Sequence, residues 1–252
     1  MKYLRITAAV LAIVSPILLL LGVALSLPAT YGDTFLAALN DKYERLYSLQ
    51  GEKVVVVGGS SVAFGYESDI LEKYLDRPVV NFGLYAALGT KLMLDLSLDA
   101  IAEGDIVLLA PEADAQTLSL YFNAESTWQA SEERRDMLRH LSMDDKLSML
   151  GGAWHYAVSS GRAQLDGALP KPEGAYRRDG FDEAGDLEYE RTENIMLGYY
   201  DAKHPVALSE QIVSENFVDY LNEYIDACHA RGATVYFVFC PINELSMSET
   251  SR

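Results

Sequence analysis

The sequence predicts an α/β fold in which a parallel sheet lies between two layers of helices, with one transmembrane helix ahead of it. Four short runs of apolar and β-branched residues predict the strands: residues 54–57, 79–83, 105–110 and 234–240. Segments with helical patterning separate these runs, as successive parallel strands require. The third observation is an uncharged N-terminal segment of the length that crosses a bilayer.

The N-terminal segment, residues 6–27, has 22 residues and no charge, close to the ~20 residues that span a bilayer core. Lys2 and Arg5 precede it, so the positive-inside rule places the N-terminus in the cytoplasm. We therefore expect residues 1–32 to be a cytoplasmic tip and a signal anchor in the cell membrane, with the rest of the chain outside the cytoplasm. A cleaved signal peptide is the alternative.

Residues 33–50 predict a helix that Asp33 caps and that packs on the domain as a stalk. Its apolar residues recur at helical spacing: Phe35, Leu39, Leu46 and Leu49. Its charged residues lie off that stripe: Lys42, Glu44 and Arg45. A lid or an interaction helix is the alternative.

Composition fits one domain after the stalk, residues 51–252. The net charge is −17 and the pI about 4.5, which argues against nucleic-acid binding and against charge-driven docking on anionic lipid. No Cys/His cluster has metal-ligand spacing, so we expect no metal, and we expect no other cofactor. Cys228 and Cys240 could pair outside the cell or stay as two buried thiols.

The first strand runs into Gly58-Gly59-Ser60-Ser61, where the glycines allow a tight turn. A serine there lies at the carboxyl edge of the sheet, where open α/β folds place their sites. The turn lacks the lysine of a P-loop, and Ala63 replaces the second glycine of Gly-x-Ser-x-Gly. A serine-rich turn that caps a helix is the alternative.

This turn resembles block I of the SGNH/GDSL hydrolases, in which Gly-Asp-Ser is followed by a glycine four residues after the serine. Gly59, Ser61 and Gly65 match, and Ser60 stands in place of the aspartate. The Gly-Ser-Ser variant is similar to the membrane-anchored branch of the superfamily that acts on cell-envelope polymers. The resemblance implies an SGNH/flavodoxin-like sheet, Ser61 as the nucleophile and its backbone N–H as an oxyanion-hole donor.

The second strand, residues 79–83, matches block II of the same family. Gly83 corresponds to the glycine whose N–H joins the oxyanion hole, and Asn81 to an asparagine often found two residues earlier. An ordinary strand-end turn is the alternative. The resemblance covers residues 53–112 well, and the rest of the chain only by the order of its elements.

Two later blocks depart from the family pattern. The third strand ends in Pro-Glu-Ala-Asp where the family has Gly-x-Asn-Asp, so a third oxyanion donor is not expected there. Glu112 could orient a substrate or a base, or it could be a solvated acid at the loop edge. The family's basic histidine follows the last strand, in Asp-x-x-His, and only residues 242–252 follow the fourth strand here.

Two Asp-x-x-His matches, ending at His204 and His229, lie before the fourth strand. His229 ends a helix at the amino edge of the sheet, opposite Ser61, whereas His204 precedes that helix and could reach Ser61. We expect the base to come from a C-terminal part that the chain lacks, which would leave this chain inactive, with His204 as the alternative base. A degenerate, non-catalytic relative is the other interpretation.

Residues 123–206 form an insertion between the third and fourth strands, where substrate choice would be built. The sequence predicts helices over residues 131–140 and 144–156, with Ser142 as the cap of the second helix. It predicts an exposed loop over residues 161–185. Tyr176-Arg177-Arg178 and Tyr189-Glu190-Arg191 pair aromatic rings with arginines. Such pairs suit sugar stacking or the binding of anionic groups, and surface packing with ion pairs is the alternative.

The sequence thus predicts an extracytoplasmic serine esterase or O-acyltransferase that acts on ester-linked acyl groups of an envelope glycan. Its expected partners are the lipid bilayer, through the N-terminal helix, and an envelope polysaccharide; no pattern defines an oligomeric state. The alternative, from a different class, is a non-catalytic anchored protein that holds a glycan or a partner in the same cleft.

Overall fold

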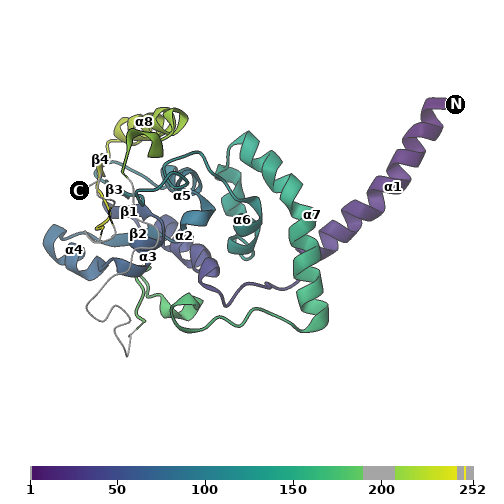
Figure 1. Cartoon of the computed structure of the whole chain (residues 1–252), viewed down its shortest axis with the longest axis horizontal. Coiled ribbons are helices and arrows are strands. Elements are labelled where there is room, and N and C mark those ends of the chain that lie inside the picture. Colours follow the sequence, from purple (N-terminus) through teal and green to yellow (C-terminus); the bar gives the residue numbers. More distant parts are fainter. Residues whose placement is uncertain (1, 190–207, 243–246, 248–252) are drawn as a thin grey trace.

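A four-stranded parallel sheet forms the centre of the computed structural model, which describes residues 2–189, 208–242 and 247. The strand order is β2-β1-β3-β4 (Figure 1). The strands are β1 Val54–Gly58, β2 Val79–Gly83, β3 Ile106–Ala110 and β4 Thr234–Phe237. All four predicted strands are present and all pair in parallel, so the predicted α/β class is confirmed.

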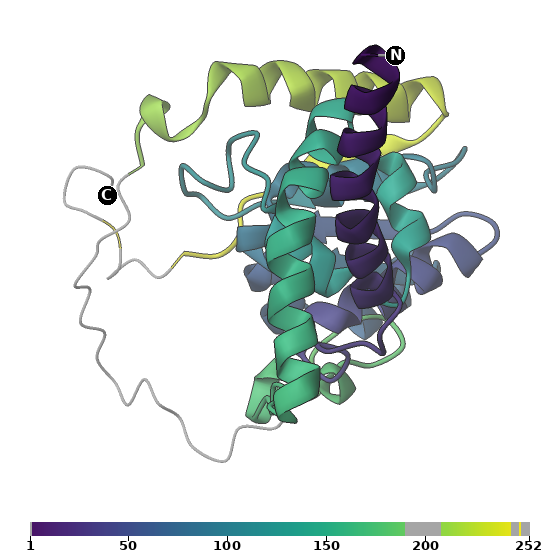
Figure 2. The same ribbon diagram turned by 90° about the vertical axis from the view of Figure 1, so that its right-hand side faces the viewer.

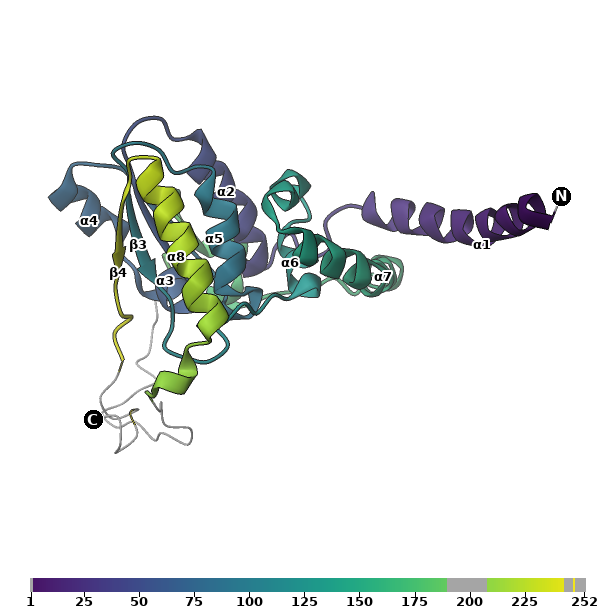
Figure 3. The ribbon, with the colours of Figure 1, turned by 90° about the horizontal axis from the view of Figure 1, so that it is seen from above.

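Helices lie on both faces of the sheet (Figure 3). One face is covered by α2 Ala38–Ser48, α5 Thr90–Leu98 and α8 Glu215–Ala230. The other face carries the shorter α3 Ser60–Gly65 and α4 Ser68–Leu75, which contact β1 and β2. On that second face β4 is open to solvent, and Tyr236 is 54% exposed.

The insertion forms α6 Ala124–Ala130 and α7 Met143–Asp166, which pack on each other. Ser142 caps α7 as predicted, because its Oγ accepts a hydrogen bond from Asp145 N at 3.2 Å. The helix predicted over 131–140 is wrong: only a 3₁₀ helix, Arg135–His140, forms there. The predicted loop 161–185 is also partly wrong, since α7 continues to its cap at Gly167.

Short 3₁₀ helices complete the described elements: Phe35–Ala37, Ala86–Leu88, Gly174–Tyr176, Arg178–Gly180 and Glu210–Ile212.

The N-terminal helix α1, Lys2–Leu25, projects from the domain, and the end nearer the domain contacts α7 (Figure 1). Seen from the side on which α1 projects, α1 and α7 lie in front of the α/β layers (Figure 2). Within the part of the chain that the structure describes, no helix combines the length and the hydropathy that a membrane span requires.

The predicted helix cap at Asp33 is wrong. Asp33 caps no helix, because Thr34 stands at the N-cap of the 3₁₀ helix that leads into α2. Ser68 is the first residue of α4 rather than its cap, and Glu67 takes the cap position. The Ser68 hydroxyl instead donates to Asp186 Oδ1 at 2.9 Å, a carboxylate more than a hundred residues away. A tertiary partner has replaced the local one.

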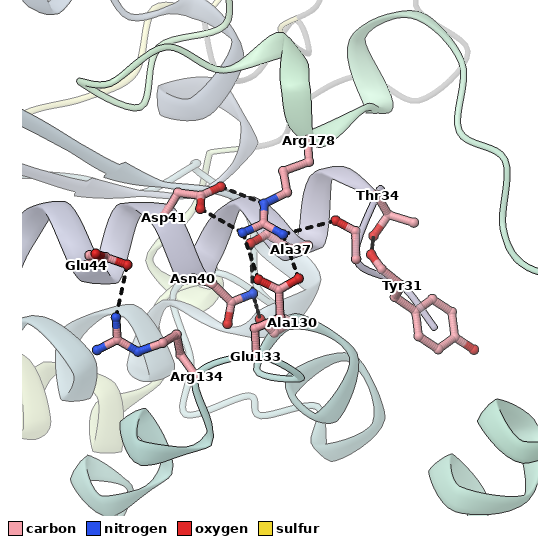
Figure 4. Close-up of polar contacts among 11 residues, drawn as sticks. Tyr31, Thr34, Ala37, Asn40, Asp41, Glu44, Ala130, Glu133, Arg134 and Arg178 are labelled. Carbon is pink, nitrogen blue, oxygen red and sulfur yellow. Dashed lines mark hydrogen bonds and ion pairs between the residues drawn. The ribbon is translucent and has the colours of Figure 1, made fainter. Parts of the chain in front are cut away.

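Arg178 ties the insertion to the rest of the domain (Figure 4). Its guanidinium donates two hydrogen bonds to Asp41 on α2, both at 2.7 Å, and two to Glu133, at 2.7 and 2.9 Å. A further bond reaches the carbonyl of Gly32 at 3.3 Å. For Arg178 the alternative interpretation, surface packing with ion pairs, therefore holds, because its guanidinium donors bond to other parts of the same domain.

Candidate active site

Ser61 lies in the first turn of α3, directly after the central strand β1, and its side chain is exposed at the carboxyl edge of the sheet. Two glycines let this short helix sit close to the strand ends. A Cβ on Gly58 would lie 2.6 Å from Ala110 O, and a Cβ on Gly83 would lie 2.5 Å from Val62 Cβ. Any side chain at either position would push α3, and with it Ser61, away from the sheet.

Glu112, at the end of β3, reaches across to the serine turn. Its Oε1 accepts a hydrogen bond from Ser61 N at 2.8 Å and another from Ser60 Oγ at 3.3 Å. Gly59 makes room for this carboxylate, because a Cβ there would lie 2.6 Å from Oε1. Glu112 is thus hydrogen-bonded to the serine turn, and is not a solvated acid at the loop edge.

The second carboxylate oxygen of Glu112 has an unusual environment. Oε2 is buried and has no hydrogen-bond partner among the described residues. A buried carboxylate oxygen without a donor is costly, by about 1–3 kcal/mol for an ordinary polar group and more for a charged one.

Asn81 organises the backbone on the β2 side of Ser61. Its Oδ1 accepts a hydrogen bond from Gly83 N at 3.1 Å, and its Nδ2 donates to Val62 O at 3.0 Å and to Asp186 Oδ1 at 2.8 Å. One side chain therefore joins β2, α3 and the insertion. Asn81 is a positioning residue in this arrangement, as its predicted supporting role suggests.

The two backbone donors predicted for an oxyanion hole are both bonded inside the protein. Ser61 N donates to Glu112, and Gly83 N donates to Asn81. An incoming oxyanion would have to replace those acceptors. The Ser61 N–H is the easier of the two to free, because a rotation of the Glu112 side chain releases it without moving the backbone.

Cys240, three residues past β4, is a neighbour of Ser61 that the sequence did not indicate. Its Sγ donates to Ala110 O at 3.0 Å, and the Ser61 side chain is near enough to influence the pKa of the thiol. Burial and the nearby Glu112 carboxylate raise the pKa of this thiol, so it is neutral near pH 7. Cys228 is buried in α8, and both cysteines are free, so the pairing considered from the sequence is not formed.

Histidine is not found next to Ser61 within residues 2–189, 208–242 and 247. His140 hydrogen-bonds Tyr43 at 2.9 Å and Asp99 at 2.9 Å, and His155 pairs with Glu125. His229 is exposed in the last turn of α8, and β4 begins shortly after that helix. His204 and Arg191 lie outside the described residues. Those residues also contain no cluster of three His, Cys, Asp or Glu side chains suited to a metal ion.

Lys42, predicted to lie off the apolar stripe of its helix, is buried, with 2% of its surface exposed. Its Nζ donates to Asn81 O at 2.9 Å and to Gly185 O at 2.5 Å. Burial lowers the pKa of this amine from 10.5 to about 7, although Asp186, Asp182 and Asp41 act in the opposite direction. The sequence spacing could have indicated that Lys42 is buried, because it follows the buried Leu39 by three residues and residues three apart lie on the same face of a helix.

Aromatic side chains gather beside α3 on its β2 side. Phe64, three residues after Ser61, contacts Tyr176 with ring centroids 6.1 Å apart. Phe35 contacts Phe64, Tyr85 and Tyr176 at centroid distances of 6.0, 5.4 and 5.7 Å. Tyr85 and Tyr176 are 39% and 61% exposed, and we call these two side chains the tyrosine platform. Tyr85 follows Gly83 by two residues, and Tyr176 contacts Phe64, which is in the same short helix as Ser61.

Comparisons with protein-family models, with curated proteins and with solved structures give no match to this chain. The geometry of the candidate site consists of an exposed serine at the carboxyl end of a central parallel strand, a carboxylate bonded to its turn, and aromatic rings on one side.

Proposed function

We propose that this chain carries a serine esterase or O-acyltransferase site of the SGNH/GDSL type, which acts on ester-linked acyl groups of an envelope glycan. The observation that carries the proposal is the exposed Ser61 on a glycine-supported turn at the carboxyl end of β1. Gly83 ends the adjacent strand in register with Gly58, which supports its proposed role as the second backbone donor. The sequence resemblance and this geometry point to the same residues.

In the proposed reaction the Ser61 Oγ attacks the carbonyl carbon of the ester. The acyl C–O bond breaks, and the alcohol leaves with the proton that a base took from the serine hydroxyl. The acyl-serine then reacts with water, giving a free acid, or with another hydroxyl group, giving a new ester. The Ser61 N–H, once exchanged from Glu112, stabilises the oxyanion by about 3–4 kcal/mol in analogy with known oxyanion holes.

The base for this step has two candidate sources. His204 precedes α8, and the start of α8 is tied to the carboxyl side of the sheet by the Ser214 N to Leu118 O bond of 3.1 Å. A histidine from a segment beyond residue 252 is the other source. Once rotated away from the Ser61 N–H, Glu112 would be free to orient either imidazole.

The tyrosine platform supports a glycan as the alcohol part of the substrate. Tyrosine rings offer flat apolar faces and a hydroxyl at the rim, the combination that suits the faces and hydroxyls of a sugar ring. Tyr85 follows Gly83 by two residues, so a sugar stacked there would lie next to the reacting ester. We further propose that residues 1–32 anchor the domain at the outer face of the cell membrane.

The nucleophile assignment is tested with a fluorophosphonate probe, which labels activated serines. Ser61→Ala should abolish labelling, and Ser60→Ala, its matched control one residue away, should retain part of it. Labelling that survives Ser61→Ala would reject Ser61 as the nucleophile. If the full-length protein is not labelled at all, the esterase proposal fails.

The anchor is tested separately by adding protease to intact spheroplasts. Digestion of the domain, with the protein still in the membrane fraction, is expected. Recovery of the protein in the medium, cut near Ala29, would show a cleaved signal instead, and protection from protease would place the domain on the other side.

The second candidate function is glycan or partner binding without catalysis. The specific observation in its favour is that Ser61 N and Gly83 N both donate inside the protein. A binding protein would hold the same glycan with wild-type affinity after Ser61→Ala and lose it after Tyr176→Ala. An enzyme would lose turnover after Ser61→Ala.

A further inference from the structure

An apolar groove lies on the other side of the serine turn, over the β3–β4 half of the sheet. Its volume is about 760 Å³, within the range of small-molecule sites. Pro111 and Ala113 line it from the loop after β3, Phe217 and Leu221 from α8, and Phe237 from β4. None of the side chains that line it in the described part of the chain is charged. Such a surface does not suit a sugar or a phosphate group.

The groove lies next to the candidate serine. Cys240 lines it, donates to Ala110 O at the end of β3, and lies near the Ser61 side chain. Pro111 and Ala113 flank Glu112, the residue that accepts from Ser61 N. A molecule that enters the groove from Ser61 therefore meets only apolar surface, apart from a neutral thiol and the hydroxyl of a lining serine.

The surfaces on the two sides of Ser61 differ in polarity, as do the alcohol half and the acyl half of a glycan ester. The tyrosine platform lies on the β2 side and the apolar groove on the β3–β4 side, with β1 and Ser61 between them. An ester carbonyl held at Ser61 would direct its alcohol to one side and its acyl chain to the other.

We propose that this groove binds the acyl chain of the substrate, and that the chain is a medium- or long-chain aliphatic group rather than acetyl. The proposal rests on the esterase function given above, since it names the acyl half of that substrate. Each methylene buried in such a groove contributes about 0.8 kcal/mol, a factor of about four in binding or in kcat/KM.

Cys240 provides a test that needs no catalysis, because it lies in the groove. The rate at which N-ethylmaleimide alkylates Cys240 is followed by mass spectrometry on the full chain at pH 9, with decanoate or acetate as the added probe. The buried Cys228 serves as an internal reference. Decanoate should slow the alkylation of Cys240 at least tenfold at saturation, and acetate should leave it unchanged.

Two substitutions on one loop make the test specific. Ala113→Trp fills the groove mouth and should remove the protection by decanoate. Ala115→Trp, an exposed position outside the groove, should retain it. Equal alkylation rates with and without decanoate in the wild-type chain would overturn the proposal. A Cys240 thiol that is unreactive without decanoate and becomes reactive on dilution would also overturn the proposal, because a second copy of the chain would then occupy the groove.

The same variants separate this inference from the proposed function. Decanoate protection together with an absence of Ser61-dependent turnover would refute the esterase and leave an apolar-chain binding groove. Turnover of acetyl and octanoyl p-nitrophenyl esters with equal kcat/KM, and no decanoate protection, would refute the groove and leave the esterase. If both hold, Ala113→Trp should abolish the octanoyl preference, and Ala115→Trp should retain it.

Discussion

Lys42→Met tests whether a buried amine lies beneath the candidate site, and the structure gives the size of the effect. Methionine matches the length and the unbranched shape of the lysine stem but has no ammonium group. In the wild-type protein the pKa of Lys42 falls from 10.5 in the unfolded chain to about 7 in the folded one. At about 1.4 kcal/mol per pH unit, burying the charged amine costs about 5 kcal/mol.

The sign of the pH effect follows from proton counting. Between about pH 7 and 10.5 the unfolded chain binds this proton and the folded chain does not, so stability rises with pH across that window. Below pH 7 the amine is charged in both states and the full cost is present. From pH 7 to pH 9 the wild-type protein should gain about 2 kcal/mol relative to Lys42→Met, which cannot titrate there.

The variant also has a cost of its own, because the carbonyls of Asn81 and Gly185 lose their donor, at about 1–3 kcal/mol each. At pH 9 we therefore expect Lys42→Met to have a lower free energy of unfolding than the wild type. At pH 7 this difference in free energy of unfolding should shift by about 2 kcal/mol in favour of the variant.

The assay is urea denaturation of the full chain at pH 6, 7, 8 and 9, followed by the fluorescence of the buried Trp128. Lys73→Met, at an exposed position on α4, is the matched control and should follow the wild-type pH dependence. A gap between wild type and Lys42→Met that stays constant from pH 7 to pH 9 would refute the argument that burial depresses this pKa.

Three further substitutions are measured by the same denaturation assay. Gly59→Ala places a Cβ 2.6 Å from Glu112 Oε1 and should lower the free energy of unfolding by about 1–3 kcal/mol. In a Glu112→Ala background it should cost much less, and strictly additive costs would show that the two residues do not meet. Arg178→Lys removes five planar donors and should cost about 1–2 kcal/mol, whereas Arg177→Lys, at an exposed pair, should stay within about 0.5 kcal/mol. Gly185→Ala forces a side chain into a φ of +94° and should cost about 1–3 kcal/mol; a loss below about 0.5 kcal/mol would show that the loop relaxes freely.

The strands could be predicted from the sequence because their signal is local. Four valines in a row suit only a strand covered on both faces, and Val54 to Val57 are all buried. The end of α8 could also be predicted, because Gly232 follows it and adopts the positive φ of +84° that is common just after a helix. Each of these features depends on residues within one short segment.

The contacts of the site could not be predicted, because they join segments far apart in the chain. Glu112 meets the serine turn from 51 residues away, and Lys42 meets Gly185 from 143 residues away. No local pattern specifies which loop will supply the partner. The length of α7 was missed for a related reason: glycines within it lower its helix propensity, yet packing on α6 and α1 maintains the helix.

The pairing of β3 with β4 has a consequence for how the protein is made. Ile106 pairs with Thr234, so the outer edge of β3 has no neighbour until about 130 more residues have left the ribosome, which takes roughly 6–26 s at the usual speed of translation. During that interval β1, β2 and β3 can already associate through contacts that are close in sequence. The nascent chain thus presents an unfinished sheet with an apolar rim, and its yield in cells should depend on holdase chaperones more than the stability of the finished domain would suggest.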